Sequence, residues 1–537
     1  MKLFYLLFIL LTLPLSTDAK LANKSTFDKI LTSANQENAQ QQLNLAAQYF
    51  KGDGVKQNKA KAIKLIKEAA RQKLPTAQYV LGWMYESGDG LKKDQDKAVI
   101  WYLKAAKQGH ALAQFALAEL YLQQKKYKKT FIWYQKAAKQ DHIDAQLFLG
   151  WLYNVGKGVA EDNKKALYWY KKAAEQNNAS AQYSYASMYE TGEGVKKDQK
   201  IAYQWYLKSA KLNFSKAFFK VGFMNDIGKG IPKNYKKALY WYQKSANQGN
   251  TYAQYNLALF YKKGYGTKKD PIKAFKWFKK SAEQGDSDAQ LNIAWAYEKG
   301  IGTQKNSTKA FQWFKKSAEQ GDRYSQFKVA RYYHSGTAVK KNISKALKWY
   351  KKSAKQGYLP AQYNIADHYF KETEIPQNYK KAFFWFKKAA EQDDADSQHY
   401  IAWMYEVGKG TIKNKTKAVK WYKKAALQGL VRAQNNLAGM YEYGKGVKKD
   451  LKEAIFWYQK AATGGNKNAQ YYLATAYYTG KNIKQNKQKA IELFLKSANQ
   501  GHKKALFTIK RLGLTLGGKK LDLSTRIESL LEVMFEE

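Results

Sequence analysis

The chain of 537 residues contains no cysteine and only six histidines. The lack of cysteine excludes a disulfide scaffold, a thiol nucleophile and thiolate metal sites. It does not argue against export, because an oxidising compartment permits disulfides without requiring them. The histidines are scattered and lack the His-Glu-x-x-His spacing of a metal-binding helix, so we expect neither a metal site nor a cofactor.

Only one long apolar run is present, from Leu3 to Leu15. It is too short to span a bilayer. A basic start, a short apolar core and the small residues that end at Ala19 are typical of a secretory signal peptide. We therefore predict a signal peptide at residues 1–19, with a permanent N-terminal anchor as the alternative. Residue 20 is lysine, so the cysteine of a lipoprotein signal is missing.

Acidic residues are few in comparison with basic ones. The chain has 94 lysines and arginines but only 43 aspartates and glutamates, which gives a formal net charge of +51. Such a charge attracts phosphate, anionic lipid, acidic glycans and acidic proteins alike. It therefore indicates association with anions without identifying the partner.

The most informative feature is a repeat with a period of 36 residues. Every step in the series is 36 residues, except the step from Ala113 to Ala145, which is 32. A period of this size indicates a stacked array, because one unit cannot bury its apolar face alone. A binding surface is thus the default function. The pair Ala-Gln marks the period at Ala77, Ala145, Ala181, Ala253, Ala289, Ala361, Ala433 and Ala469, with variants at Ala113, Ala217, Ser325, Ser397 and Ala505.

Most repeats read as two helices joined by a glycine turn. The exceptions are the unit from Ala113, with Gln123-Gln124-Lys125-Lys126 in its place, and the unit from Ala361, whose segment 371–376 has no glycine. In the unit from Ala77 to Gly109, apolar residues recur at helical spacing before and after the turn Gly88-Asp89-Gly90. The first stripe consists of Ala77, Leu81, Met84 and Tyr85, and the second of Ala98, Trp101, Tyr102, Ala105 and Ala106.

Twelve second helices are preceded by a residue that suits an N-cap. Asparagine and aspartate side chains accept hydrogen bonds from the free amides at a helix start. The slot contains Asn58, Asp94, Asp162, Asp198, Asn234, Asp270, Asn306, Asn342, Asn378, Asn414, Asp450 and Asn486.

The motif Tyr85-x-x-Gly88-x-Gly90 through Lys97-Ala98-x-x-Trp101-Tyr102-x-Lys104-Ala105-Ala106-x-Gln108-Gly109 resembles the sel-1-like repeat family, relatives of tetratricopeptide repeats. The resemblance covers residues 41–512. It implies an all-α protein, an α-solenoid of about thirteen two-helix repeats and a right-handed superhelix. We expect residues 20–40 to cap its N-terminus. Thr525 and Glu528 have capping-box spacing, so we expect 513–537 to form a C-terminal capping helix.

The resemblance also implies a function. Bacterial members of the family are typically exported or envelope-associated adaptors that act in cell-wall and exopolysaccharide assembly, in regulation or in host-cell entry. One cysteine-rich branch is associated with penicillin binding and β-lactamase activity, and this chain departs from it because it lacks cysteine.

A candidate binding groove follows from the slots that point away from the first-helix stripe. An exposed slot that varies between units is free to serve a ligand, and first helices line the concave face of such solenoids. Exposed aromatic residues are frequent anchors of partner contacts. The groove would consist of Trp83, Trp151, Trp295 and Trp403, with Glu86, Glu190, Glu298 and Glu406 beside them. The alternative is that these tryptophans only fill gaps between repeats.

The leading hypothesis is a non-enzymatic, exported adaptor, periplasmic or secreted, that binds a protein partner through this groove. The second is a lysine-driven binder of an anionic glycan or a membrane surface. A β-lactamase-like hydrolase is the third. It rests on the cysteine-rich branch alone, since the Ser-x-x-Lys spacing of Ser325 and Lys328 falls on the repeat's Ala-Gln slot. We do not expect nucleic acid as a partner, because a signal peptide would separate the protein from most of it.

Overall fold

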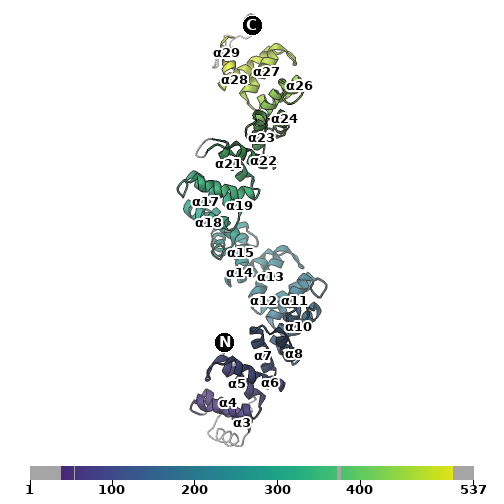
Figure 1. Ribbon diagram of the computed structural model, residues 1–537, viewed down its shortest axis with the longest axis vertical. Helices are drawn as coiled ribbons and strands as arrows, with labels where there is room; N and C mark the ends of the chain where they lie inside the picture. Colours follow the sequence, from purple (N-terminus) through teal and green to yellow (C-terminus); the bar gives the residue numbers. More distant parts are fainter. Residues whose placement is uncertain (1–37, 54, 372–375, 512–537) are drawn as a thin grey trace. The chain divides into compact units, whose positions relative to one another are not determined.

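The computed structural model describes residues 38–53, 55–371 and 376–511. These residues contain 27 helices and no strand. The helices follow one another along the chain as antiparallel pairs (Figure 1). The predicted all-α solenoid of thirteen helix pairs is therefore confirmed, with α29 as the first helix of a further half unit. The proposed segments 1–19 and 513–537, and all but the end of 20–40, lie outside the described residues and stay predictions.

The chain divides into two compact units, and the division falls between Asp270 and Pro271. Helices of the first unit are α3 (Ala39–Lys51), α4 (Lys59–Arg71), α5 (Pro75–Ser87), α6 (Gln95–Lys107), α7 (Ala111–Gln123), α8 (Tyr127–Ala138), α9 (Ile143–Val155), α10 (Asn163–Glu175), α11 (Ala179–Thr191), α12 (Gln199–Lys211), α13 (Ser215–Ile227), α14 (Tyr235–Asn247) and α15 (Thr251–Lys263).

Helices of the second unit are α16 (Pro271–Glu283), α17 (Ser287–Lys299), α18 (Ser307–Glu319), α19 (Arg323–Ser335), α20 (Ile343–Lys355), α21 (Leu359–Phe370), α22 (Tyr379–Ala390), α23 (Ala395–Val407), α24 (Lys415–Leu427), α25 (Val431–Glu442), α26 (Leu451–Thr463), α27 (Lys467–Thr479), α28 (Lys487–Asn499) and α29 (Lys503–Arg511). Odd-numbered helices are the first helices of the repeats, and even-numbered helices are the second.

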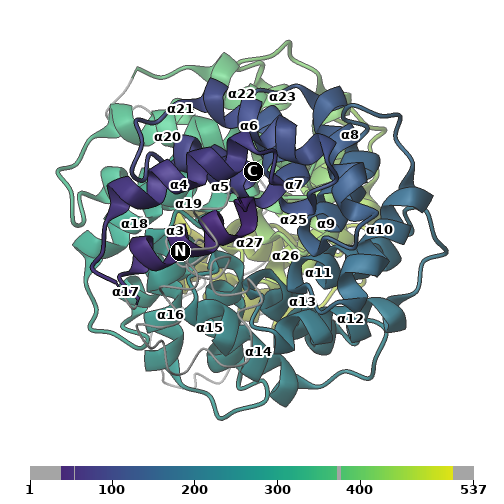
Figure 2. The same ribbon diagram turned by 90° about the horizontal axis from the view of Figure 1, so that it is seen from below.

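Within the first unit the two kinds of helix lie on opposite sides of the curve that the chain follows. The first helices α9, α11 and α13 lie on the inner side, and the second helices α8, α10, α12 and α14 lie on the outer side (Figure 2). The inner side is the one on which the sequence places the candidate groove.

The glutamine of the Ala-Gln pair links consecutive repeats, which explains why the pair recurs. The Gln78 side-chain amide donates to the carbonyl of Ala70 at the end of the preceding second helix (3.1 Å). Its carbonyl in turn accepts from the Gln108 side chain at the end of its own second helix (2.8 Å). The same Gln–Gln bond joins Gln72–Gln42, Gln140–Gln114, Gln176–Gln146, Gln320–Gln290, Gln356–Gln326, Gln392–Gln362, Gln428–Gln398 and Gln500–Gln470.

The predicted N-caps of the second helices are confirmed at eleven of the twelve positions, and the cap predicted at Asp270 stays a prediction. Asp94 Oδ1, for example, accepts from the Lys97 amide at 2.9 Å. The same bond to a backbone amide is made by Asn58, Asp162, Asp198, Asn234, Asn306, Asn342, Asn378, Asn414, Asp450 and Asn486.

The backbone of the glycine turn packs closely against the preceding repeat. At Gly158, the second glycine of its turn, a Cβ atom would overlap the carbonyl group of Tyr127 at the start of α8. Its φ of 76° also favours glycine. The turn motif is thus a stacking contact as well as a helix end.

Candidate functional site on the first helices

The four candidate tryptophans lie on α5, α9, α17 and α23, and all are partly buried. In the first unit, Trp83 and Trp151 pack against the hydrophobic core. The Lys157 ammonium lies over the Trp151 ring, 5.3 Å from its centroid. Each ring thus contributes to repeat packing and keeps only a part of its surface for a ligand.

In the second unit the tryptophans contact the neighbouring repeat. The Trp295 ring stacks on Tyr324 of the next first helix, with centroids 5.6 Å apart, and Lys328 lies 5.0 Å from its centroid. The Trp403 ring meets Phe370 of the preceding first helix edge-on at 5.4 Å. The predicted groove therefore has tryptophans that also fill gaps between repeats, and their role in binding stays a prediction.

Three of the four candidate glutamates accept hydrogen bonds from buried tyrosines of the second helices. Glu86 accepts from the Tyr102 hydroxyl at 2.8 Å, and Glu406 accepts from Tyr422 at 2.9 Å. Burial raises the pKa of the Tyr102 hydroxyl, so this group stays a neutral donor. Asp226 and Glu442 hold Tyr242 and Tyr458 in the same way. These carboxylates thus tie the two helices of one repeat together.

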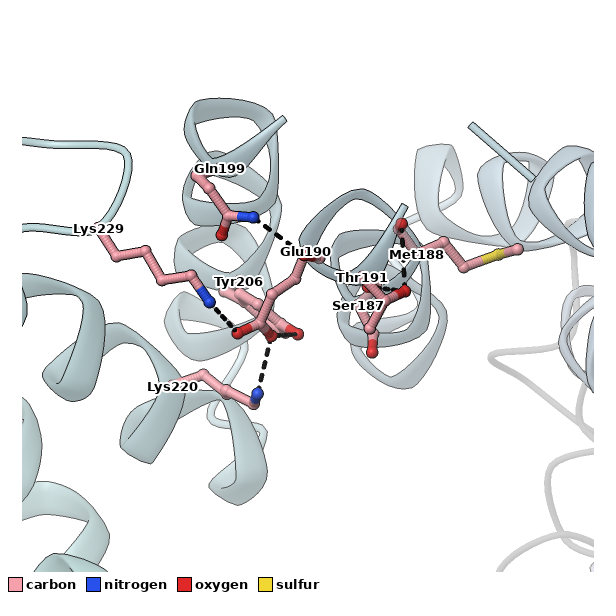
Figure 3. Close-up of polar contacts among 8 residues, drawn as sticks. All are labelled: Ser187, Met188, Glu190, Thr191, Gln199, Tyr206, Lys220 and Lys229. Carbon is pink, nitrogen blue, oxygen red and sulfur yellow. Dashed lines mark hydrogen bonds and ion pairs between the residues drawn. The ribbon is translucent and has the colours of Figure 1, made fainter. Parts of the chain in front are cut away.

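Glu190 forms the most buried of these contacts (Figure 3). Its carboxylate accepts from the Tyr206 hydroxyl at 2.7 Å and pairs with Lys220 at 2.7 Å and Lys229 at 3.0 Å. Burial alone would raise the Glu190 pKa, but the hydrogen bonds from Lys220, Tyr206 and Lys229 outweigh it and lower the pKa to about 2. Glu190 therefore stays ionised and joins α11 and α12 to the next repeat.

Glu298 differs because the residue opposite it in the second helix is Phe314, which has no hydroxyl. It pairs instead with Lys328 of the next first helix at 2.5 Å and accepts from the Tyr332 hydroxyl at 3.1 Å. Lys328 is thereby held between this carboxylate and the Trp295 ring.

Beside this pair lies a cavity of about 440 Å³ that carries a net positive charge. Glu298 is its only carboxylate, and Lys328 already neutralises it. The remaining cations can therefore receive an anionic group from a partner. The lining consists of Glu298, Lys299, Lys305, Ser307, Lys328, Arg331, Tyr332, Ser335 and Thr337. Arg331 occupies the variable slot that holds Trp295 in the preceding repeat. The groove predicted from the tryptophans did not include Arg331.

Histidines of the first unit have a structural role that the sequence reading missed. Nδ1 of His110 accepts from the Ala113 amide, and Nδ1 of His142 accepts from the Ala145 amide, both at 3.2 Å. They cap first helices in the slot that is Asn178 or Asn250 in other repeats. Burial lowers the pKa of both imidazoles, that of His110 to about 4. The sequence signal that could have revealed this capping role was the position of both histidines directly before a first helix.

The described part of the chain holds no group of three or more histidine, aspartate or glutamate side chains that could bind a metal ion. None of its helices is long and apolar enough to cross a bilayer. The Ser325 hydroxyl is fully buried and donates to Ser317 at 2.9 Å, and Lys328 is paired with Glu298. The Ser-x-x-Lys pair is thus part of the repeat packing.

These features define a helix-pair solenoid scaffold. The chain belongs to the Sel1 repeat family, whose proteins are generally protein-interaction modules. The Sel1 repeat matches residues 42–74, 75–110, 111–142, 143–178, 179–214, 215–250, 251–286, 287–322, 323–358, 359–394, 395–430, 431–466 and 467–502.

One solved structure supports this assignment, and a second is similar in sequence. A protective antigen present in uropathogenic Escherichia coli strains, which displays an SLR fold, is 32% identical, covers 92% of this chain and 99% of its own, and has a TM-score of 0.57. A Sel1 repeat protein from Oxalobacter formigenes is 29% identical over 57% of this chain and 89% of its own, with a TM-score of 0.46. No curated protein matches the chain.

Proposed function

We propose that the chain is a non-enzymatic scaffold that binds a protein partner through the exposed sides of its first helices, termed the first-helix face. The family supports this proposal, since Sel1 repeat proteins generally bind proteins. In the second unit the partner inserts an acidic side chain into the cavity between Lys299, Lys305 and Arg331 and contacts the exposed part of Trp295.

The observation that carries the proposal is one variable slot on a regular scaffold. The Ala-Gln slot is buried and hydrogen-bonded in repeat after repeat, as at Gln290 and Gln326, so the fold determines it. The slot of Trp295 holds Arg331 in the next repeat and Gly439 further on. Because the fold accepts tryptophan, arginine and glycine in this slot, the residue in each repeat can be the one that suits a specific ligand.

We also propose that the protein acts outside the cytoplasm, in the periplasm or as a secreted protein. The basis is the signal-peptide pattern of residues 1–19. Cell fractionation tests it. The full chain is expected in the periplasmic or medium fraction without residues 1–19, whereas a chain that starts at residue 20 stays in the cytoplasm. Retention of the full chain in the cytoplasm would contradict export.

The binding proposal is tested by affinity enrichment from envelope and medium fractions, with the purified chain as bait and identification by mass spectrometry. The double variant Lys299→Glu/Arg331→Glu reverses the charge of the cavity. The control Lys351→Glu/Lys355→Glu makes the same charge change at exposed positions of α20. We expect one protein that survives high salt, is retained by the control and is lost with the cavity variant.

A partner retained by both variants would place binding elsewhere and contradict the cavity assignment. If both variants lose the partner equally, net charge and not the cavity governs binding. Circular dichroism of all three proteins verifies that the charge reversals leave the helices intact.

A further inference from the structure

The second helices carry exposed aromatic rings in a slot that repeat packing does not use. The slot lies directly before the second-helix tryptophan. It holds Tyr168 on α10, Tyr240 on α14, Phe384 on α22 and Phe456 on α26, and these side chains are 52, 53, 52 and 45% exposed. About half of each residue is thus available to a ligand.

Each exposed ring stands almost perpendicular to the tryptophan beside it. The centroids of Tyr168 and Trp169 are 5.1 Å apart at 80°, and those of Tyr240 and Trp241 are 5.0 Å apart at 79°. Phe384–Trp385 and Phe456–Trp457 repeat this geometry at 84° and 82°. The tryptophan holds the exposed ring in a fixed orientation, so little side-chain entropy is lost when a ligand stacks on it.

A lysine one turn further on completes three of these sites. The ammonium groups of Lys172, Lys244 and Lys460 lie 5.9, 5.2 and 5.2 Å from the centroids of Tyr168, Tyr240 and Phe456. Lys388 occupies the equivalent position after Phe384. Three of the four sites therefore combine a flat apolar surface with a cation, whereas Lys388 pairs with Glu391 at 3.9 Å.

Other repeats of the same chain demonstrate that the fold does not require these rings. The same slot is Gln204 in α12 and Gln312 in α18, and both helices have the same length as α10 and α14. Lys276, Lys348 and Lys420 fill it in three further repeats, and Ile100 and Ile132 fill it on α6 and α8, where they are 51 and 47% exposed. An exposed aromatic ring gains little from folding, so a ligand is the better explanation for the four.

The rings are regularly placed within each unit. Tyr168 and Tyr240 lie two repeats apart on α10 and α14, and these two helices lie on the outer side of the first unit (Figure 2). Phe384 and Phe456 are also two repeats apart, on α22 and α26. Regular spacing along a rigid scaffold suits a ligand that is itself a repeating polymer.

We propose that these four sites bind an acidic polysaccharide. The apolar C–H face of a sugar ring stacks on an aromatic ring, and the adjacent lysine pairs with a carboxylate or sulfate of the polymer. The net charge of +51 favours an anionic chain over a neutral one. A membrane surface fits less well, because the slot is apolar in consecutive second helices only at Ile100, Ile132 and Tyr168. Gln204 separates Tyr168 from Tyr240, and Lys420 separates Phe384 from Phe456, so the four rings form no continuous apolar face. This proposal does not depend on the first-helix face.

The test replaces all four rings with the residue that other repeats already have in the slot: Tyr168→Gln, Tyr240→Gln, Phe384→Gln and Phe456→Gln. Binding of the full chain to polygalacturonate and to neutral dextran is measured by calorimetry at 0.15 M salt. We expect the wild type to bind polygalacturonate and not dextran. The variant should bind polygalacturonate at least roughly tenfold more weakly, because it loses all four aromatic stacking surfaces. Its helical circular dichroism should be unchanged.

Equal binding of polygalacturonate by variant and wild type would overturn the proposal, because the lysines alone would then suffice. Failure of the wild type to bind polygalacturonate would overturn it too. Binding to phosphatidylglycerol vesicles without binding to polygalacturonate would assign these rings to a membrane surface instead.

Discussion

Leu212 lies where other repeats have a glutamine that donates to the glutamine of their first helix, and the Gln182 carbonyl oxygen is consequently buried without a hydrogen-bond donor. In the preceding repeat the equivalent Gln176 donates to Gln146 at 2.8 Å. The interruption adjoins a cavity of about 400 Å³ that Gln182, Trp205 and Leu212 help to line.

We predict that Leu212→Gln stabilises the protein by about 1 kcal/mol, because it supplies the missing donor to a buried acceptor. Urea unfolding followed by circular dichroism measures the change. Leu212→Ala is the matched control, since it removes the leucine without adding a donor. If the glutamine variant is no more stable than the alanine variant, the missing donor is not what limits stability at this position.

Ala338 occupies a slot that is glycine in most turns, and its φ is 64°. A left-handed conformation costs a residue with a Cβ atom about 1–2 kcal/mol relative to glycine. Ala338→Gly should therefore raise the free energy of unfolding by about 1 kcal/mol. The reverse exchange at Gly410 should destabilise the protein, because a Cβ atom there would overlap the carbonyl group of Tyr379. Thermal unfolding compares the two variants, and a destabilised Ala338→Gly would refute this explanation.

His110 and His142 should make the stability of the first unit depend on pH. Their folded-state pKa values lie below the ordinary value of 6.5, that of His110 at about 4. Their contribution is complete above pH 6.5 and is lost as the pH falls from 6.5 towards 4, because only the unfolded state then binds protons readily. For His110 the loss amounts to about 3 kcal/mol.

The double variant His110→Asn/His142→Asn retains a capping side chain and removes the titration. Urea unfolding at pH 7 and pH 4.5 should therefore show a smaller pH effect for this variant than for the wild type. An identical pH dependence would mean that other groups cause it.

Glu190 should contribute to stability in a lower pH window. Its folded-state pKa of about 2 lies below the ordinary 4.5, so its stabilisation is present above pH 4.5 and is lost as the pH falls from 4.5 to 2. Glu190→Gln leaves Lys220 and Lys229 without their carboxylate and should cost about 2 kcal/mol at pH 7.

Glu86→Gln is the comparison for this prediction. Glu86 binds the Tyr102 hydroxyl, and no ion pair with a lysine is seen for it in the described part of the chain. We expect a smaller loss for Glu86→Gln than for Glu190→Gln in thermal unfolding at pH 7. Equal losses would show that the tyrosine bond, and not the two lysines, gives Glu190 its importance.

The helix pairs and their ends could be predicted from the sequence because their signals are local. Asp94 caps a helix that begins one residue later, and Trp101 and Tyr102 follow at helical spacing. The pattern also recurs in thirteen repeats, so it could be recognised even though single repeats depart from it.

The partners of the candidate site residues could not be predicted in the same way. Whether Glu190 lies free in a groove depends on Tyr206, 16 residues later, and on Lys220, 30 residues later. The periodic pattern also hid the features that differ between repeats. Comparing equivalent slots would have found Leu212, because the slot is glutamine in most repeats.

The most direct test of the central claim is hydrogen exchange of the full chain, with and without the protein partner identified by enrichment. Binding through the first-helix face predicts slower amide exchange in α17 and α19, around the cavity that Arg331 lines, with little change in α18 and α20. Protection confined to the second helices α18 and α20, with α17 and α19 unchanged, would contradict the proposed binding face.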